Sequence, residues 1–176
     1  MVHHLTPSQH LFYPNPIVPG RKSKQLVKIR QATENDILRI IELYGELSIT
    51  TSQVEQTLSP SSDEYRRVFT EICADPKHEL LVAESQGQVV GTIALLIVPN
   101  LSHNATPYAI AENLIVTRQH RRQGIARKLL EYCIARAREE SCHRIELCSD
   151  RRREEAHRLY RSLGFEPSAY GFRIYF

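Results

Sequence analysis

The chain has 176 residues, the size of one ordinary domain. It is 41% hydrophobic and 24% charged, which excludes a disordered polyelectrolyte, a collagen-like repeat and a disulfide-stabilised miniprotein. The formal charge of +3 is smaller than the clustered basic excess typical of duplex-binding domains, so we expect no nucleic-acid partner.

The apolar pattern does not indicate membrane insertion or export. A membrane-spanning helix requires about 18 consecutive apolar residues, whereas the longest apolar run, 89–98, contains Gly91 and Thr92 and ends at Pro99. The first residues also lack the apolar core of an export signal. We therefore expect a cytoplasmic protein with no membrane partner.

The chain has four cysteines, at positions 73, 133, 142 and 148. None forms a CxxC pair, and no histidine stands at the spacing typical of a zinc finger. Because a chain of this length can bury its own core without cross-links, we expect reduced thiols and no metal site. A disulfide or a zinc site is the alternative.

Two regions follow one another along the chain. Residues 1–25 contain Pro7, Pro14 and Pro16 and then a basic cluster, which predicts an N-terminal arm that is flexible or docked on the domain. Residues 26–176 show regular patterns without internal repeats or low-complexity tracts. They are predicted to form a single domain.

The first half of this domain predicts one strand, two helices and a hairpin. Apolar and polar residues alternate at 26–30, which predicts a strand. Thr33 is placed to cap a helix whose first turn holds Glu34 and Asp36. The remaining expected elements are a loop at 50–60, a helix at 62–74 and hairpin strands at 79–84 and 88–98.

The second half alternates strands and helices. The expected elements are a loop at 99–107, a strand at 108–116, a helix at 124–140, a strand at 144–148, a helix at 152–163 and a last strand at 169–176. A strand–helix–strand order in this half indicates a crossover connection, so the chain is predicted to be a mixed α/β (α+β) domain.

A basic segment precedes the helix expected at 124–140. The preceding loop carries Arg121 and Arg122, and the helix begins at Gly124 with Arg127 and without an acidic residue in its first turn. Positive side chains at the positive end of a helix dipole are unfavourable unless an anion binds there. The free N–H groups of the first turn, with a glycine, suit a pyrophosphate. A solvated loop with an incidental glycine is the alternative, since neither GxGxxG nor GK[ST] is present.

A second pattern lies in the last expected helix. Ala156, Leu159 and Leu163 share one helix face, and Gly164 is placed to end the helix. Tyr160 falls on or beside this apolar face. Taken alone, Tyr160 is interpreted as a core tyrosine with a bonded hydroxyl.

Together and in this order, the two segments resemble the GNAT superfamily of acetyl-CoA-dependent N-acetyltransferases. The motif R-x-x-G-x-A at 121–126 is similar to the pyrophosphate loop of the superfamily, Q/R-x-x-G-x-G/A, and A-x-x-x-Y-x-x-x-G-F at 156–165 is similar to its C-terminal signature. The resemblance extends from about residue 27 to the C-terminus. It implies a mixed, mostly antiparallel central sheet flanked by about four helices, with a splayed strand pair that forms the CoA cleft.

The resemblance also implies which residues bind the co-substrate, acetyl-CoA. Main-chain groups of Leu114, Ile115 and Val116 would bond the pantetheine arm, with an amide near Val116 facing the thioester carbonyl. The pyrophosphate would lie against the amides and side chains of the following loop, formed by Arg121, Arg122, Gln123, Gly124, Ile125, Ala126 and Arg127. No metal cofactor is implied.

Two residues are catalytic candidates. A primary amine has a pKa near 10.4, so removing its proton at pH 7 costs about 4–5 kcal/mol and a base is useful. By resemblance, Glu112 stands where several family members carry a carboxylate and would be that base. A strand-edge glutamate paired with an arginine is the alternative. Tyr160 is similar to the tyrosine whose hydroxyl lies near the thioester sulfur, and would act as a general acid.

One position departs from the pattern of the superfamily. Many members carry an asparagine seven residues before the tyrosine, where this chain has Arg153. Arg153 and its neighbours Arg151 and Arg152 would bond the co-substrate, meet an acidic acceptor or face water.

The sequence therefore predicts an N-acetyltransferase that moves an acetyl group from acetyl-CoA to a primary amine of a small-molecule acceptor. The alternatives are a non-catalytic acyl-CoA-binding or sensory module and, ranked last, a nucleic-acid-binding domain. No residue pattern names the acceptor. A homodimer, formed through the last strand or the N-terminal arm, is expected only by analogy with the family.

Overall fold

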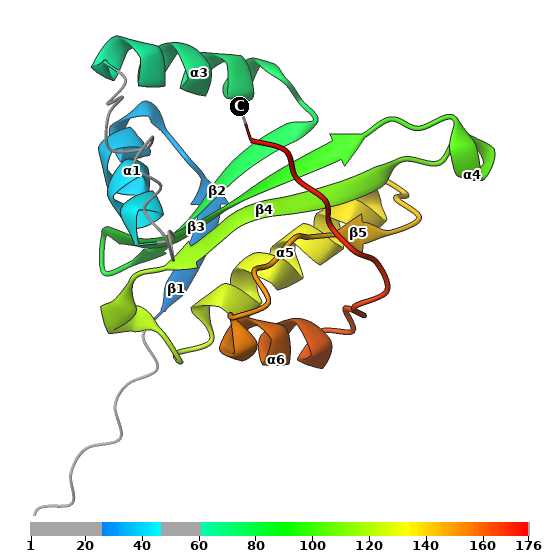
Figure 1. Cartoon of the computed structure of the whole chain (residues 1–176). Helices are drawn as coiled ribbons and strands as arrows, with labels where there is room; N and C mark the ends of the chain where they lie inside the picture. Colours follow the sequence, from blue (N-terminus) through cyan, green and yellow to red (C-terminus); the bar gives the residue numbers. More distant parts are fainter. Residues whose placement is uncertain (1–25, 47–60, 176) are drawn as a thin grey trace, which may run out of the picture.

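The computed structural model describes residues 26–46 and 61–175 of the chain (Figure 1). The strands are β1 (Val27–Gln31), β2 (His78–Ser85), β3 (Gln88–Val98), β4 (Tyr108–Val116) and β5 (Ile145–Glu146). The helices are α1 (Ile37–Gly45), α3 (Ser62–Ala74), the short α4 (Ser102–Ala105), α5 (Ile125–Glu139) and α6 (Glu154–Ser162), with 3-10 turns η1 (Glu34–Asp36) and η2 (Arg118–His120).

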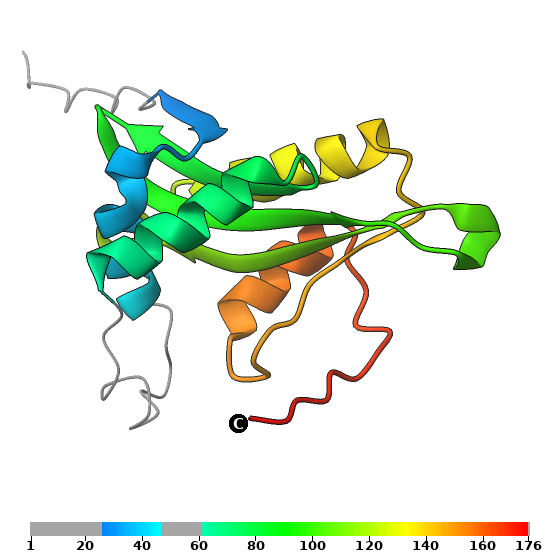
Figure 2. The same ribbon diagram turned by 90° about the horizontal axis from the view of Figure 1, so that it is seen from above.

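The five strands form one sheet in sequence order. Strands β1 to β4 pair antiparallel, whereas β4 and β5 pair parallel because α5 carries the chain back across the sheet. The ends of β3 and β4 reach beyond the rest of the sheet and carry α4 at their tip (Figures 1 and 2). The expected mixed, mostly antiparallel sheet is therefore confirmed.

Helices cover both faces of this sheet, as the two views show (Figure 2). Alternating strand residues point to opposite faces, so Leu81 packs in the larger core under α5, while its neighbour Val82 packs against α1. The apolar stripe of α5, which includes Leu129 and Cys133, is fully buried in that larger core. Helix α6 packs on the edge of the same core through partly buried side chains.

The predicted cap at Thr33 is confirmed, and it is built around a buried carboxylate. Asp36 accepts hydrogen bonds from the Thr33 amide (2.7 Å) and hydroxyl (2.9 Å). The guanidinium of Arg30, on β1, donates two more to the same carboxylate, at 2.7 and 3.1 Å. The chain enters α1 through the 3-10 turn η1, which ends at Asp36. The charge-assisted bonds between Arg30 and Asp36 therefore join β1 to the start of the first helix.

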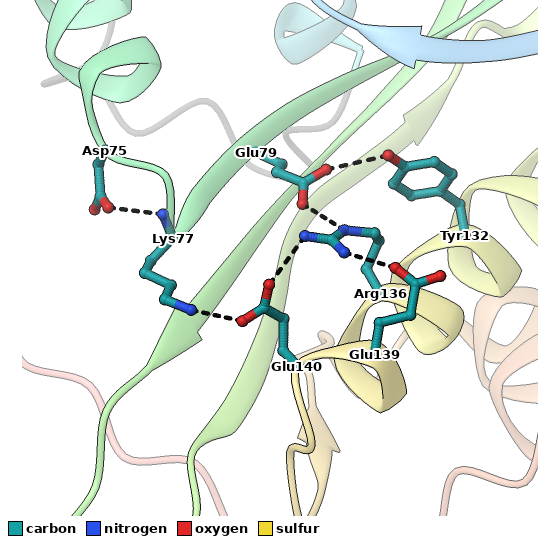
Figure 3. Close-up of polar contacts among 7 residues, drawn as sticks. All are labelled: Asp75, Lys77, Glu79, Tyr132, Arg136, Glu139 and Glu140. Atoms are coloured by element: carbon teal, nitrogen blue, oxygen red, sulfur yellow. Dashed lines mark hydrogen bonds and ion pairs between the residues drawn. The ribbon is translucent and has the colours of Figure 1, made fainter.

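A second ion-pair network joins β2 to α5 (Figure 3). Glu79 is buried on β2 and accepts hydrogen bonds from Arg136 (2.8 Å) and from the Tyr132 hydroxyl (3.2 Å). The remaining guanidinium nitrogens of Arg136 donate to Glu139 and Glu140. The buried charge of Glu79 is thus paired and hydrogen-bonded, as burial of a carboxylate requires.

The end of the chain differs from the prediction. Residues 169–175 form no strand within the described part of the chain, although their apolar residues alternate. The strand expected at 144–148 is also reduced to Ile145–Glu146, because β5 pairs with β4 at two positions only and then diverges. Because β5 is only two residues long, it offers few main-chain groups with which a further strand could form hydrogen bonds.

Other boundaries change less. The loop expected at 99–107 contains α4, in which His103 and Asn104 have left-handed backbone conformations. The arm at 1–25 and the loop at 50–60 lie outside the described residues. Within 26–46 and 61–175, no helix is long and apolar enough to cross a membrane.

Candidate functional site

Strands β4 and β5 diverge after a short paired stretch (Figure 1), and residues of both segments line a pocket there. The two strands pair only between Ala109 and Ile145 and between Ile110 and Glu146. Beyond these pairs lies a solvent-open pocket of about 200 Å³. Its lining residues are Ile93, Ala111, Glu112, Asn113, Leu114, Leu130, Leu147, Cys148, Ser149, Asp150, Arg153, Tyr160 and Arg173.

A β-bulge in β4 shapes one wall of this pocket. The register between β3 and β4 shifts between Thr92 and Ala94, and Asn113 has a left-handed φ of +57°. A bulge bends its strand and re-aims the neighbouring side chains. Glu112 and Leu114, on either side of Asn113, both line the pocket. Sequence reasoning did not find this bulge, and its one local signal is an asparagine, which tolerates the left-handed region better than most residues.

The next two residues of β4 belong to the core rather than to the pocket wall. The side chains of Ile115 and Val116 are buried. Their backbones stand opposite Thr92 and Gly91 of β3. The chain then leaves the sheet through Thr117, whose amide still donates to the Val90 carbonyl at 2.9 Å. The expected pantetheine-binding residues thus end in a rigidly held strand that leads directly into the basic loop.

The loop ends in an uncapped helix. Gly124 precedes α5 with a φ of +80°, no side chain caps the helix, and its first turn has no acidic residue. Arg122 also has a left-handed backbone, with a φ of +60°. Within the described residues, the amides of Arg122, Gln123 and Gly124 donate no hydrogen bond. Exposed amides in such a turn make a concave anion site, which the helix dipole strengthens.

The space around Gly124 is open to a ligand. A Cβ built on this glycine would meet no protein atom within 4 Å. No atom of the described residues therefore crowds the Cα of Gly124, where a ligand would approach the main chain. The orphaned amides and the open approach fit a bound diphosphate, as the basic helix start predicts.

Arg121 has a different position from its neighbour. Its Nε donates to the Val116 carbonyl at 3.0 Å, and its guanidinium lies 3.7 Å from Glu46. Glu46, at the end of α1, also accepts hydrogen bonds from the Thr117 hydroxyl (2.9 Å) and the Arg118 amide (3.0 Å). Although desolvation opposes them, these donors lower the pKa of Glu46. Arg121 and Glu46 therefore hold the loop after β4 in place. Sequence reasoning did not identify this role of Glu46.

The remaining loop residues have mixed surroundings. Arg122 is exposed, and the Gln123 amide nitrogen donates to the Gln119 carbonyl at 3.3 Å. Ile125 is buried in the core. Arg127 donates to the hydroxyl of Ser162 at 2.6 Å, which ties α5 to α6. Ala126 packs against the same core and is partly buried.

Tyr160 lies on the opposite wall of the pocket from β4. Helix α6 supplies it, and its ring packs edge-to-face on Phe165 with centroids 6.1 Å apart. Burial raises the pKa of the Tyr160 phenol, and a hydrogen bond with Ser149 opposes this shift. Ser149 also lies 3.2 Å from the Nε2 atom of His157. The phenol is therefore protonated at neutral pH and faces the same pocket as Glu112.

The chain between β5 and α6 carries charge to the pocket. Asp150 accepts two hydrogen bonds from the Arg152 guanidinium, at 2.9 and 2.7 Å, and this pairing lowers the pKa of the Asp150 carboxyl. The Arg153 amide donates to the Asp150 carbonyl at 3.0 Å, and Arg153 itself lines the pocket. Among the described residues, no cluster of His, Cys, Asp and Glu is arranged to hold a metal ion.

The structure thus brings Glu112, Leu114 and Tyr160 together and places the basic loop directly after β4. It also adds Ser149 and Arg173, which sequence reasoning missed. No local pattern signals either residue, because both reach the pocket through the tertiary path of the chain.

Comparisons with known proteins agree with this arrangement. The family described as "Acetyltransferase (GNAT) family" matches residues 46–165 of the chain. Among characterised relatives, the aminoalkylphosphonate N-acetyltransferase of Salmonella typhimurium is 31% identical over 145 residues, which are 82% of this chain and 88% of that protein.

Two solved structures show a similar fold at a similar level of identity. A putative acetyltransferase from Agrobacterium tumefaciens is 31% identical, with a TM-score of 0.74, over 84% of this chain and 99% of that one. A transcriptional regulator from Bacillus halodurans is 30% identical, with a TM-score of 0.76, over 86% of this chain and 100% of that one.

Proposed function

Because the chain belongs to the acetyltransferase (GNAT) family, we propose that this enzyme moves an acetyl group from acetyl-CoA to a primary amine of a small-molecule acceptor, by direct attack in a ternary complex. The observation that carries the proposal is the combination of an uncapped, basic helix start at Gly124 with a pocket lined by Glu112 and Tyr160. The first feature suits a diphosphate and the second suits proton transfer.

The residues after the β4 bulge would hold the co-substrate. The amides from Arg122 to Arg127, with the side chain of Arg122, would bind the diphosphate, while the main chain at Leu114, Ile115 and Val116 would bind the pantetheine arm. Arg121 would act mainly by holding the loop, since its guanidinium is bonded to the Val116 carbonyl. Acetyl-CoA, when bound, supplies the activated acetyl group as a thioester.

Glu112 would accept the proton of the acceptor amine. It lines the pocket beside the bulge, and within the described residues its carboxylate is held by no hydrogen bond or ion pair. A carboxylate that is not already neutralised can receive a proton directly or through a water molecule. This placement favours the role of a base over that of a strand-edge glutamate paired with an arginine.

Tyr160 would hold a proton near the sulfur of the leaving thiolate. Its raised pKa keeps the phenol protonated, and Ser149 and Phe165 fix the position of the ring. Because a thiolate has a pKa near 8.5 and leaves readily, we expect this proton to contribute less than the positioning of the reacting groups.

A small, amine-bearing acceptor is the substrate class that we propose. The relative from Salmonella typhimurium is named for aminoalkylphosphonates, so short aminoalkyl acids and simple alkylamines form the first panel to test.

Release of free CoA thiol with this amine panel tests the proposal. We expect amine-dependent thiol release that Glu112→Gln lowers strongly at pH 7 and less at pH 9, since more of the amine is then unprotonated. A protein that binds acetyl-CoA but releases no thiol with any amine would instead be an acyl-CoA-binding module, and the proposed transfer would be wrong.

We also propose that two copies of the chain associate through the segment 169–175. Tyr170, Phe172 and Ile174 are 92%, 93% and 78% exposed, although each is a large apolar side chain. Extended chain with a free apolar side is a typical surface for pairing with an identical segment about a two-fold axis. Light scattering should give a dimer, and Phe172→Ser should shift it toward monomer. A wild-type monomer at all concentrations would contradict this proposal.

A further inference from the structure

The C-terminal segment delivers an arginine to the pocket. After α6 the chain turns at Phe165 and continues as residues 166–175, drawn in red in Figure 1. This segment passes outside the sheet, beyond β5 (Figures 1 and 2). Arg173 nevertheless lines the same pocket as Glu112 and Tyr160.

The two sides of this segment face different surroundings. A Cβ on Gly171 would lie 3.6 Å from the Cys148 sulfur, so the side that carries positions 171 and 173 faces the pocket wall. The alternate side chains of Phe172 and Ile174 point to solvent. Arg173, the one cation of residues 166–175, therefore lines the pocket, whereas the large side chains beside it are exposed.

The guanidinium of Arg173 is available to a ligand. Within residues 26–46 and 61–175 it forms no hydrogen bond or ion pair. The nearby carboxylate of Asp150 is already bonded twice by Arg152. The pocket thus combines the carboxylate of Glu112, which attracts an ammonium group, with a guanidinium, which attracts an anion.

We propose that Arg173 is a specificity-determining residue, which binds the anionic group of an acceptor whose amine faces Glu112. The acceptor class is a short alkyl chain with a primary amine at one end and a phosphonate or carboxylate at the other. This inference rests on the acetyl transfer proposed above. The planar fork of a guanidinium pairs with either acid in two parallel hydrogen bonds, which a neutral alkylamine cannot form.

The test compares three acceptors of similar length: 3-aminopropylphosphonate, 4-aminobutanoate and butylamine. Arg173→Gln should lower kcat/KM at least about tenfold for the acid that the enzyme uses, mainly through KM, and change the value for butylamine less than twofold. Arg173→Lys should restore part of the loss, because it keeps the charge without the fork. Arg67→Gln, which removes an exposed arginine paired with Glu71 on α3, is the matched control.

Calorimetry measures acceptor binding without acetyl transfer, so it tests the role of Arg173 independently of the proposed reaction. The acid preferred by the wild type should bind at least about tenfold more weakly to Arg173→Gln. Equal binding by wild type and Arg173→Gln, or an equal loss of kcat/KM for acid and amine, would overturn the role of Arg173 while the transfer stands. Acid binding that depends on Arg173 without thiol release would support the anion site and refute the transfer.

Discussion

Glu112 on β4 and Tyr160 on α6 face the same pocket, and the pKa of the Tyr160 phenol is raised by its burial and, to a smaller extent, by the charge of Glu112. The Tyr160 phenol therefore stays protonated at neutral pH. A carboxylate can accept a proton while the phenol keeps one to donate. This placement supports our proposal that the acceptor amine attacks the thioester between Glu112 and Tyr160, where the thiolate then leaves.

Replacement of Tyr160 by phenylalanine should lower kcat by one to three decades, the usual contribution of a general acid. The fold should be retained, because the ring still packs on Phe165. Tyr132→Phe is the control: it removes a hydrogen-bonded phenol on α5, which donates to Glu79 outside the pocket, and it should leave kcat unchanged. Steady-state kinetics at saturating acetyl-CoA provide the measurement, and unchanged turnover in Tyr160→Phe would remove the phenol from the mechanism.

Replacement of Arg122 by glycine should stabilise the free protein and weaken its affinity for CoA. The left-handed backbone at this position (φ +60°) costs a non-glycine residue about 1–2 kcal/mol, so the melting temperature should rise by about 2–8 °C. Loss of the side chain should weaken CoA binding about tenfold at low salt and less at high salt. Arg122→Ala keeps the strained backbone and should weaken CoA without raising the melting temperature. Undiminished CoA affinity at low salt would exclude Arg122 from the phosphate site.

Asp36→Asn should destabilise the fold at pH 7 by about 1–3 kcal/mol, because the guanidinium of Arg30 would lose one of its two charged partners and keep only Glu84. The bond from Arg30, with the Thr33 donors, lowers the pKa of the Asp36 carboxyl from its ordinary value. A depressed carboxyl pKa contributes stability above the unfolded pKa, and this stability is lost as the pH falls through the folded pKa.

Urea unfolding at pH 7 and near pH 3 measures this difference. The gap between wild type and Asp36→Asn should be wide at pH 7 and narrow in acid. Asp63→Asn, at a carboxylate with a side chain 88% exposed, should change stability by about 0.5 kcal/mol or less at either pH. A pH-independent gap for Asp36→Asn would mean that its effect is not electrostatic.

Local patterns predict much of this fold. The hairpin strand expected at 88–98 is β3 (Gln88–Val98), and the cap at Thr33 forms as expected. The basic, uncapped start of α5 is also predictable from the sequence. It depends only on Gly124 and on the lack of acidic residues in the first turn of the helix. Membership of the GNAT family, expected from the two motifs, is confirmed.

Features that depend on distant partners are not predictable in this way. The bulge at Asn113 belongs to the pairing of β4 with β3, whose register shifts there, and that pairing joins residues about 20 positions apart in the chain. The strand expected at 169–176 is wrong for the described residues 169–175. Alternating apolar residues fit a strand, but they do not show whether the sheet has a free edge strand with which the segment can pair. Glu46 and Arg173 reach the site from opposite ends of the domain, so no spacing along the chain relates them to Gly124.

A pair of glycine substitutions tests most directly whether the amides at Gly124 bind the diphosphate of CoA. Gly124 and Gly87 both have left-handed backbones (φ +80° and +75°), and a Cβ on either would meet no protein atom within 4 Å. Gly124→Ala and Gly87→Ala should therefore lose similar stability, about 1–2 kcal/mol each.

Calorimetric titration with CoA and with pantetheine, which lacks the phosphates, then distinguishes the two sites. Gly124→Ala should bind CoA at least about tenfold more weakly than Gly87→Ala, because the added methyl group blocks close approach to the amides. The affinity for pantetheine should be the same in both variants. Equal affinity of the two variants for CoA would contradict the placement of the diphosphate at the start of α5.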